Sequence, residues 1–193
     1  GWPLWMATFE LDPSDPGSAD LWRAFLARLR GRLRRFHAGD PTRPFPLLYP
    51  AGFAGMNRAG GGAFSGAALT WSQAIDADGN ALVTMTGLPA NLALSTGDYI
   101  GWRWDEAGQP GANLNRRTMA RMVTPAVASG AGGVTVMIEP PIDSRVVPAG
   151  AVAHLDRPLC TMQLVPEKSR LGPIGRGGAL SGGTMVAMQD LRA

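Results

Sequence analysis

Turn-forming residues divide most of this sequence into short segments. The 193 residues include 26 glycines and 16 prolines, and neither residue type is well tolerated inside a helix. Hydrophobic residues still make up 45% of the chain, which is enough to build a packed core. We therefore expect a mainly β (α+β) protein in which short strands alternate with turns.

One stretch has helical periodicity and extends from Leu21 to Phe36. Its large apolar residues recur at steps of three and four and so share one face. They are Trp22, Phe25, Leu26, Leu29, Leu33 and Phe36. Ser18 is the expected N-cap and Gly39 the expected C-cap, with His37 close to the last helical carbonyls. The pattern predicts a single amphipathic helix.

The order of the expected strands suggests how the chain is divided. Strands are predicted at 5–11, 68–75, 81–86, 99–104, 118–123, 134–139, 146–155, 159–165 and 184–188. A strand and the helix come first and two strands come last, so we expect the helix to pack on a small sheet built from both chain ends. This predicts a discontinuous α+β domain over 1–66 and 158–193. Residues 67–157 then form an inserted small β-barrel or sandwich.

Two segments rich in proline and glycine belong to the predicted discontinuous domain. Residues 40–66 contain four prolines and a glycine triplet, and residues 172–183 are rich in glycine. We interpret the first as an extended arm followed by a flexible joint. Arms of this length are unusual in a self-contained domain of this size, and they suggest that neighbouring subunits order them.

Arginine dominates the basic residues, with 17 arginines against one lysine and a net charge of +3. Six arginines fall within the predicted helix. Arginine is enriched at protein interfaces and also neutralises nucleic-acid phosphates, although a solvated helix face or GC-rich coding explains the same pattern. No nucleic-acid-binding motif accompanies them, so nucleic acid is not the expected partner. The candidate interface residues on this segment are Arg23, Arg30, Arg34 and Arg35.

Two tryptophans complete the set of candidate interface residues. Trp102 and Trp104 lie two positions apart in a predicted strand and therefore share a face. Exposed aromatic rings can stack on sugars, whereas buried ones are simply part of a core. With the arginine-rich helix, they support the alternative function of a carbohydrate- or nucleic-acid-binding β module.

The sequence contains no constellation that indicates catalysis, a cofactor or a metal. His37 and His154 are the two histidines and lack metal-ligand spacing, and His154 is expected on a surface or strand edge. The single cysteine, Cys160, lies in an apolar run and is interpreted as a small core residue. Asp76 and Asp78 are expected to set the geometry of a turn, with a calcium site as the alternative. We therefore expect a protein that is not an enzyme.

Neither end nor interior suggests a membrane protein. No apolar run approaches the roughly 20 residues that span a bilayer. The first five residues, Gly1 to Trp5, lack the basic and apolar regions of a signal peptide, so export by the usual route is not expected.

The order of several short motifs resembles that of a known family. The helix reads Leu-Trp-Arg-Ala-Phe-Leu-Ala-Arg-Leu-Arg-Gly-Arg over 21–32 and is followed by Asp40-Pro41. Later come Leu-Ser-Thr-Gly-Asp-Tyr-Ile at 94–100, Ile-Glu-Pro-Pro-Ile at 138–142, and Asp-Arg-Pro at 156–158 before a closing strand. This combination, spread over most of the chain, resembles minor tail proteins encoded by siphophages, prophages and gene-transfer-agent-like clusters of proteobacteria.

The resemblance implies a role close to that of distal tail proteins. In such proteins a belt domain forms a ring that joins the tail tube to the baseplate hub, and a smaller β domain faces outward. The implied partners are copies of this chain, the tail tube and the hub proteins. The implied location is the tail tip of a virion that assembles in the host cytoplasm. The family brings no catalytic residues.

Overall fold

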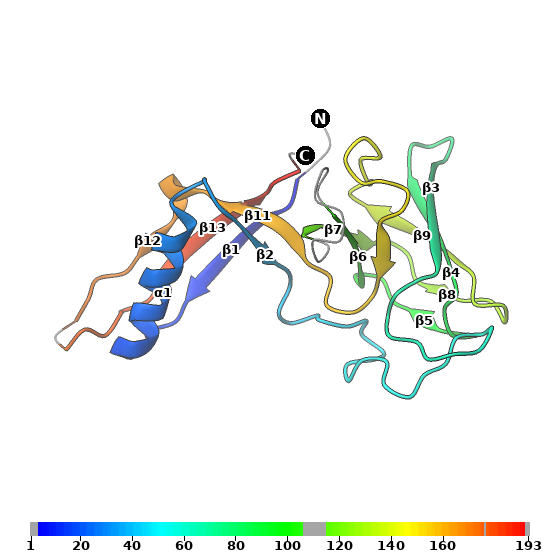
Figure 1. Ribbon diagram of the computed structural model, residues 1–193, viewed down its shortest axis with the longest axis horizontal. Coiled ribbons are helices and arrows are strands. Elements are labelled where there is room, and N and C mark those ends of the chain that lie inside the picture. The colour runs from blue at the N-terminus through cyan, green and yellow to red at the C-terminus, as the bar shows by residue number, and fades with distance from the viewer. Residues whose placement is uncertain (1–3, 106–114, 176, 192–193) are drawn as a thin grey trace. The chain divides into compact units, whose positions relative to one another are not determined.

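The computed structural model describes residues 4–105, 115–175 and 177–191 (Figure 1). These residues form a mainly β protein with antiparallel sheets and one α-helix. They divide into two compact units. The end-built unit consists of Leu4–Ala38 and Thr161–Asp190, and the central unit is built mainly from Gly39–Cys160. The loop predicted at 105–115 falls largely outside the described residues.

The sheet of the end-built unit combines strands from both ends of the sequence. Its order is β1 (Met6–Leu11), β13 (Gly183–Gln189), β11 (Cys160–Leu164) and β2 (Arg35–Ala38). The short β12 (Arg170–Leu171), which follows the 3-10 helix η1 (Pro166–Lys168), also pairs with β13. Strands β1 and β13 are antiparallel, from Met6 opposite Met188 to Leu11 opposite Gly183. The most N-terminal and most C-terminal strands are therefore direct neighbours.

The helix of this unit starts earlier than the sequence pattern predicted. Helix α1 extends over Pro16–Leu29, and its N-cap is Asp15 rather than Ser18. The Asp15 carboxylate accepts hydrogen bonds from the backbone N–H groups of Gly17 and Ser18. Pro16, which has no N–H to satisfy, occupies the first helical position. The Asp-Pro pair is therefore a stronger start signal than the serine that follows it.

The helix also ends sooner than predicted. Arg30 caps it in the left-handed conformation, with φ 49°, and Gly31 follows with φ 66°. The turn that these residues form redirects the chain, so that Arg35–Ala38 becomes strand β2. Gly39 is consequently not a C-cap, and His37 lies in a strand rather than at the helix end. Pairing in the sheet has outweighed the helical periodicity that continues to Phe36.

Helix α1 lies along the sheet of the end-built unit (Figure 1), and its apolar side chains form a core with residues of the sheet. The buried centre of this core consists of Leu29, Leu164 and Met185. Around it lie partly buried apolar residues, four aromatic and one aliphatic: Phe9, Trp22, Phe25, Leu26 and Phe36. Phe25 contacts Trp22 and Phe36 edge-to-face, with centroid distances of 6.0 and 5.6 Å. This small core joins helix and sheet into one unit.

The central unit contains a six-stranded antiparallel sheet. Its order is β10 (Val152–His154), β6 (Tyr99–Trp104), β7 (Arg116–Met122), β9 (Val134–Glu139), β4 (Ala81–Thr86) and β3 (Thr70–Ile75). A separate two-stranded sheet pairs β5 (Ala93–Leu94) with β8 (Ala126–Val127). Strands β3, β4 and β9 alternate between more buried and more exposed residues, as expected for strands with one face towards a core.

The predicted barrel is not closed among the described residues, because β10 and β3 are the two edges of this sheet. The chain just before β3 crosses part of the gap. Ala68 N–H donates to Ala153 O at 2.9 Å, and Leu155 N–H donates to Gly66 O at 2.8 Å. Ala67 and His154 form an isolated bridge pair at this place. A few residues of pairing at an irregular segment do not make a strand, so the sheet remains open.

The segment that was predicted to be an extended arm is folded onto the central unit. Phe53 and Phe64 are buried in its core, with Phe45 and Tyr49 packed against them. The rings of Phe53 and Phe64 are 4.9 Å apart. The arm prediction for 40–66 is therefore wrong, because aromatic residues spaced among the glycines and prolines anchor this segment. Residues 39–66 consequently cluster with the central unit and not with the end-built unit.

A buried carboxylate fastens the same segment at a second point. Asp98 lies in the turn before β6 and is almost completely buried. Its two oxygens accept the N–H of Leu47 at 2.8 Å and the N–H of Ser95 at 2.7 Å. The Arg43 guanidinium is 3.8 Å away. The Gly-Asp-Tyr turn therefore has a structural task, since its aspartate joins two segments about 50 residues apart in sequence.

Candidate assembly interface

The candidate arginines divide into two groups according to their contacts. Arg23 forms an ion pair with Asp20, one turn away on α1. Arg35 Nε donates to Asp190 Oδ2 at 2.7 Å, and the Asp190 side chain is buried. These two arginines therefore stabilise the end-built unit itself. They are less available to a partner than the sequence analysis expected.

Arg30 and Arg34 are both exposed, as the interface prediction requires. Arg28, in the last turn of α1, is exposed beside them. None of these three guanidinium groups makes an ion pair within residues 4–105, 115–175 and 177–191, whereas Arg32 pairs with Glu167 at 3.0 Å. We call Arg28, Arg30 and Arg34 the basic end, since they surround the point where the helix stops.

Leu33 directly precedes Arg34 of the basic end and is exposed, although the sequence pattern predicted it on the apolar face of the helix. Leu33 is 81% exposed, because the helix stops at Leu29 and Leu33 falls in the turn that follows. Leu21, near the start of α1, is 73% exposed, and Met6 on β1 is 57% exposed. Exposed apolar side chains mark a binding surface where they form one patch, whereas single ones are common on protein surfaces. Leu21 and Met6 were missed because sequence periodicity does not show which face of an element lacks a neighbour.

The two candidate tryptophans are core residues. Trp102 is 0% exposed and Trp104 is 8% exposed, and both belong to the central hydrophobic core. Trp71 contacts Trp102 edge-to-face at 5.5 Å, and its indole N–H donates to Ala151 O. Neither candidate ring presents a face to solvent on which a sugar could stack. Their placement at the interface is therefore corrected, and the core alternative holds.

His154 is buried, contrary to the expectation of a surface or edge position. Its ring lies against Gly101 on the neighbouring strand, where a Cβ would come within 2.7 Å of Nε2. Nδ1 is 2.7 Å from Asp156 O, so it must carry the proton that this carbonyl accepts. Burial, together with Arg103 and Arg117, lowers the pKa of His154 to about 4. A glycine directly across the strand pair makes the space for the ring.

Cys160 and Asp76, the other candidates for chemistry, have the following surroundings. Cys160 is buried as predicted, and burial raises the pKa of its thiol to about 12, so it remains protonated. The turn prediction for Asp76 is confirmed, since its Oδ1 accepts the N–H groups of Asp78 and Asn80 at 2.9 and 2.8 Å. Hydrogen bonds from Asn80 lower the pKa of this carboxyl. Among the residues that the structure describes, no group of His, Cys, Asp and Glu side chains could hold a metal ion.

No model of a known protein family matches the chain, and a search of curated proteins finds no significant match. The single helix of the described part is too short and too polar to cross a bilayer.

Proposed function

We propose that this chain is a structural subunit of the tail tip or baseplate of a long-tailed bacteriophage or a related particle. Copies of the chain form a ring of the distal-tail type, which joins the tail tube to the hub. The end-built unit supplies the belt of the ring, and the central β unit is the outward domain. The role is non-enzymatic, and the subunit works inside a virion assembled in the host cytoplasm.

The observation that supports this proposal most is the exposure of large apolar side chains on the end-built unit. Leu33, Leu21 and Met6 are all more than half exposed, although the unit has only a small core of its own. Strand β1 is also an edge of its sheet among the described strands. Exposed leucines and an open strand edge promote association, and an assembly subunit uses both.

The alternative of a binding module loses its sugar-stacking part, because Trp102 and Trp104 are buried. A nucleic acid remains the alternative partner, because the exposed arginines of the basic end could neutralise its phosphates. A nucleic-acid-binding module would remain monomeric, and its affinity for a DNA or RNA oligonucleotide would fall steeply with salt.

Native mass spectrometry and electron microscopy of the purified full-length chain test the proposed function. We expect ring-shaped oligomers of a single copy number. Leu33→Ser should weaken the ring without unfolding the monomer, since Leu33 contributes nothing to the core. Leu29→Ser is the contrasting variant and should unfold the end-built unit. A chain that remains monomeric and binds oligonucleotides at micromolar concentration contradicts the proposal.

A further inference from the structure

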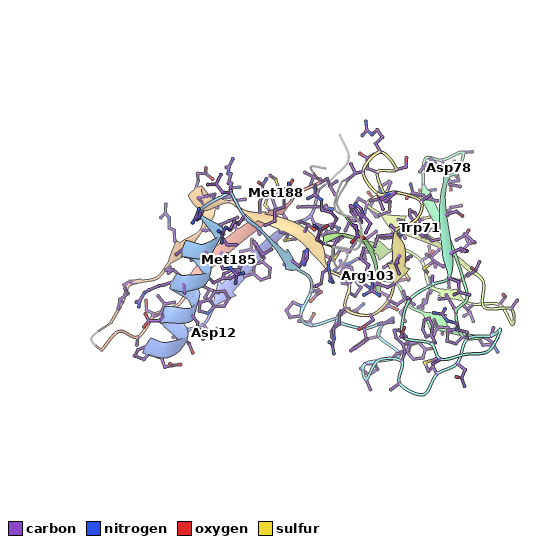
Figure 2. All side chains as sticks on the ribbon, in the orientation of Figure 1. Asp12, Trp71, Asp78, Arg103, Met185 and Met188 are labelled. Atoms are coloured by element: carbon purple, nitrogen blue, oxygen red, sulfur yellow. The ribbon has the colours of Figure 1, made fainter. Side chains whose placement is uncertain are left out.

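The charges of the end-built unit are separated along its helix. Before α1 come Glu10 on β1 and Asp12 shortly after it, both exposed. Figure 2 labels Asp12 near the start of α1. Neither forms an ion pair among the described residues. We call Glu10 and Asp12 the acidic end. The basic end, with Arg28, Arg30 and Arg34, lies where the same helix stops. Among the described residues, each end thus has charges of one sign that no ion pair neutralises.

The two ends are too far apart to neutralise each other within one copy. Helix α1 has 14 residues, which at 1.5 Å per residue separate them by about 21 Å. The Debye length at physiological ionic strength is about 8 Å, so charges at this separation are screened. Nearer charges of opposite sign are already in use, since Asp20 pairs with Arg23 and Glu167 with Arg32. Arg170 is the basic residue closest in register to Glu10 and lies two strands away.

Each end also has an apolar residue that a partner could cover. Leu33 stands between Arg32 and Arg34, and Leu21 follows Asp20 in the first half of α1. An apolar centre with a charged rim is the usual composition of a protein interface. The two surfaces differ in the sign of their charges, so repulsion between like charges opposes the pairing of either surface with a copy of itself. They can pair with each other on successive copies.

We propose that the basic end of one copy docks on the acidic end of the next, in a head-to-tail contact of the end-built units. The inference rests on the proposed function and identifies the surfaces that would form its ring. Contacts between two different patches are heterologous, and they give a closed ring where the rotation between copies returns to its start. A second copy is the favoured occupant because the complementary charges belong to the same chain.

Charge reversal at each end tests this pairing. One variant combines Glu10→Arg with Asp12→Arg, and the other combines Arg30→Glu with Arg34→Glu. Asp78→Arg, in an exposed turn of the central unit, is the control for a charge reversal at a residue outside both ends. Circular dichroism melting first verifies that each variant folds. Sedimentation velocity then measures association at several salt concentrations.

We expect the unaltered chain and the Asp78→Arg control to associate, with affinity weakening about tenfold or more in high salt. Each end variant alone should remain monomeric, because both of its ends then have the same sign. An equimolar mixture of the two end variants should associate again, with the two chains alternating and hence an even number of copies. Recovery in the mixture cannot come from a variant that is merely misfolded.

Three outcomes overturn the inference. The first is an unaltered chain that remains monomeric at its highest soluble concentration in low salt. The second is association of the end variants as strong as that of the control, and the third is a mixture of the two end variants that does not associate. If Arg30→Glu with Arg34→Glu abolishes oligonucleotide binding and leaves association unchanged, the basic end serves nucleic acid and the inference also fails. Rings that persist in both end variants refute these surfaces but leave the proposed function intact. The absence of any ring, together with absence from particles, refutes both.

Discussion

Replacing Asp98 with alanine should loosen the attachment of the Pro-rich segment 40–50 to the rest of the central unit. The change removes the acceptor of two hydrogen bonds, from Leu47 N–H and Ser95 N–H. It also removes the acidic group closest to Arg43, at 3.8 Å. Hydrogen bonds to a charged group contribute about 1.5–3 kcal/mol each. Both donors are only partly buried, so water recovers some of this energy. We expect a total loss of about 3 kcal/mol in the free energy of unfolding.

Urea unfolding of the full-length chain measures this loss, with Asp78→Ala as the matched control. Asp78 is exposed in its turn, and removing its side chain should change stability by less than about 0.5 kcal/mol. Amide hydrogen exchange gives a local readout, because the Tyr49 N–H donates to Pro46 O within the 40–50 segment and exchanges faster when this segment opens. Asp98→Ala should accelerate exchange of the Tyr49 N–H more than exchange of the Val147 N–H, which donates to Asp143 O. If Asp98→Ala unfolds at the urea midpoint of the control and the Tyr49 N–H stays protected, Asp98 does not fasten this segment.

Three further predictions concern other buried contacts. The unfolded chain protonates His154 near pH 6.5 and the folded chain only near pH 4, so this residue's stabilisation is complete above pH 6.5 and falls by about 3 kcal/mol towards pH 4. Thermal melts between pH 7 and 4.5 should show a shallower decline for His154→Gln, and equal slopes refute the assignment. Gly132→Ala should cost at least about 1–2 kcal/mol, since Gly132 has φ 76° and a Cβ there would lie 2.2 Å from Leu88 O. Gly130→Ala in the same turn meets no atom within 4 Å and should be nearly neutral, so equal urea midpoints for the two variants contradict this account. Arg35→Ala should cost about 2 kcal/mol because it removes an ion-pair partner of buried Asp190, while Arg34→Ala should leave the melting temperature unchanged. Similar melting temperatures for these two variants would show that the Arg35 ion pair contributes little.

Much of the strand pattern could be predicted from local sequence. The alternation of Ala81–Thr86 and Val134–Glu139 and the turn signals around them locate both strands at their observed bounds. Tyr99–Trp104 is likewise found where the aromatic and β-branched residues predict it. Such segments are predictable because one face is buried and the flanking turns have strong residue preferences.

The parts that sequence patterns missed depend on distant contacts. The apolar period of α1 continues to Phe36, yet the chain leaves the helix at Arg30 because residues 35–38 pair in the sheet. Phe45, Tyr49 and Phe53 recur every four residues, but the prolines and glycines among them disfavour the helix that this spacing would indicate, so their common core with Phe64 was not evident. Their aromatic character was the one signal that could have revealed it.

The candidate interface was predictable only in part, for the same reason. Arg30 and Arg34 are exposed as expected, but the partner of Arg35 is Asp190, 155 positions away. Trp102 and Trp104 do share a face, and sequence alternation cannot say whether that face is covered. The exposure of Leu33 follows from the helix end that the sequence pattern misplaced.

The location of the protein in a particle tests the central claim most directly. Particles prepared from cells that carry the gene would be labelled with gold-conjugated antibodies raised against the purified chain and imaged by electron microscopy. The account predicts label at one end of each tail, at the junction of tube and baseplate. Particles that carry no label, from cells in which the chain is produced in soluble form, would contradict a structural role in the tail tip.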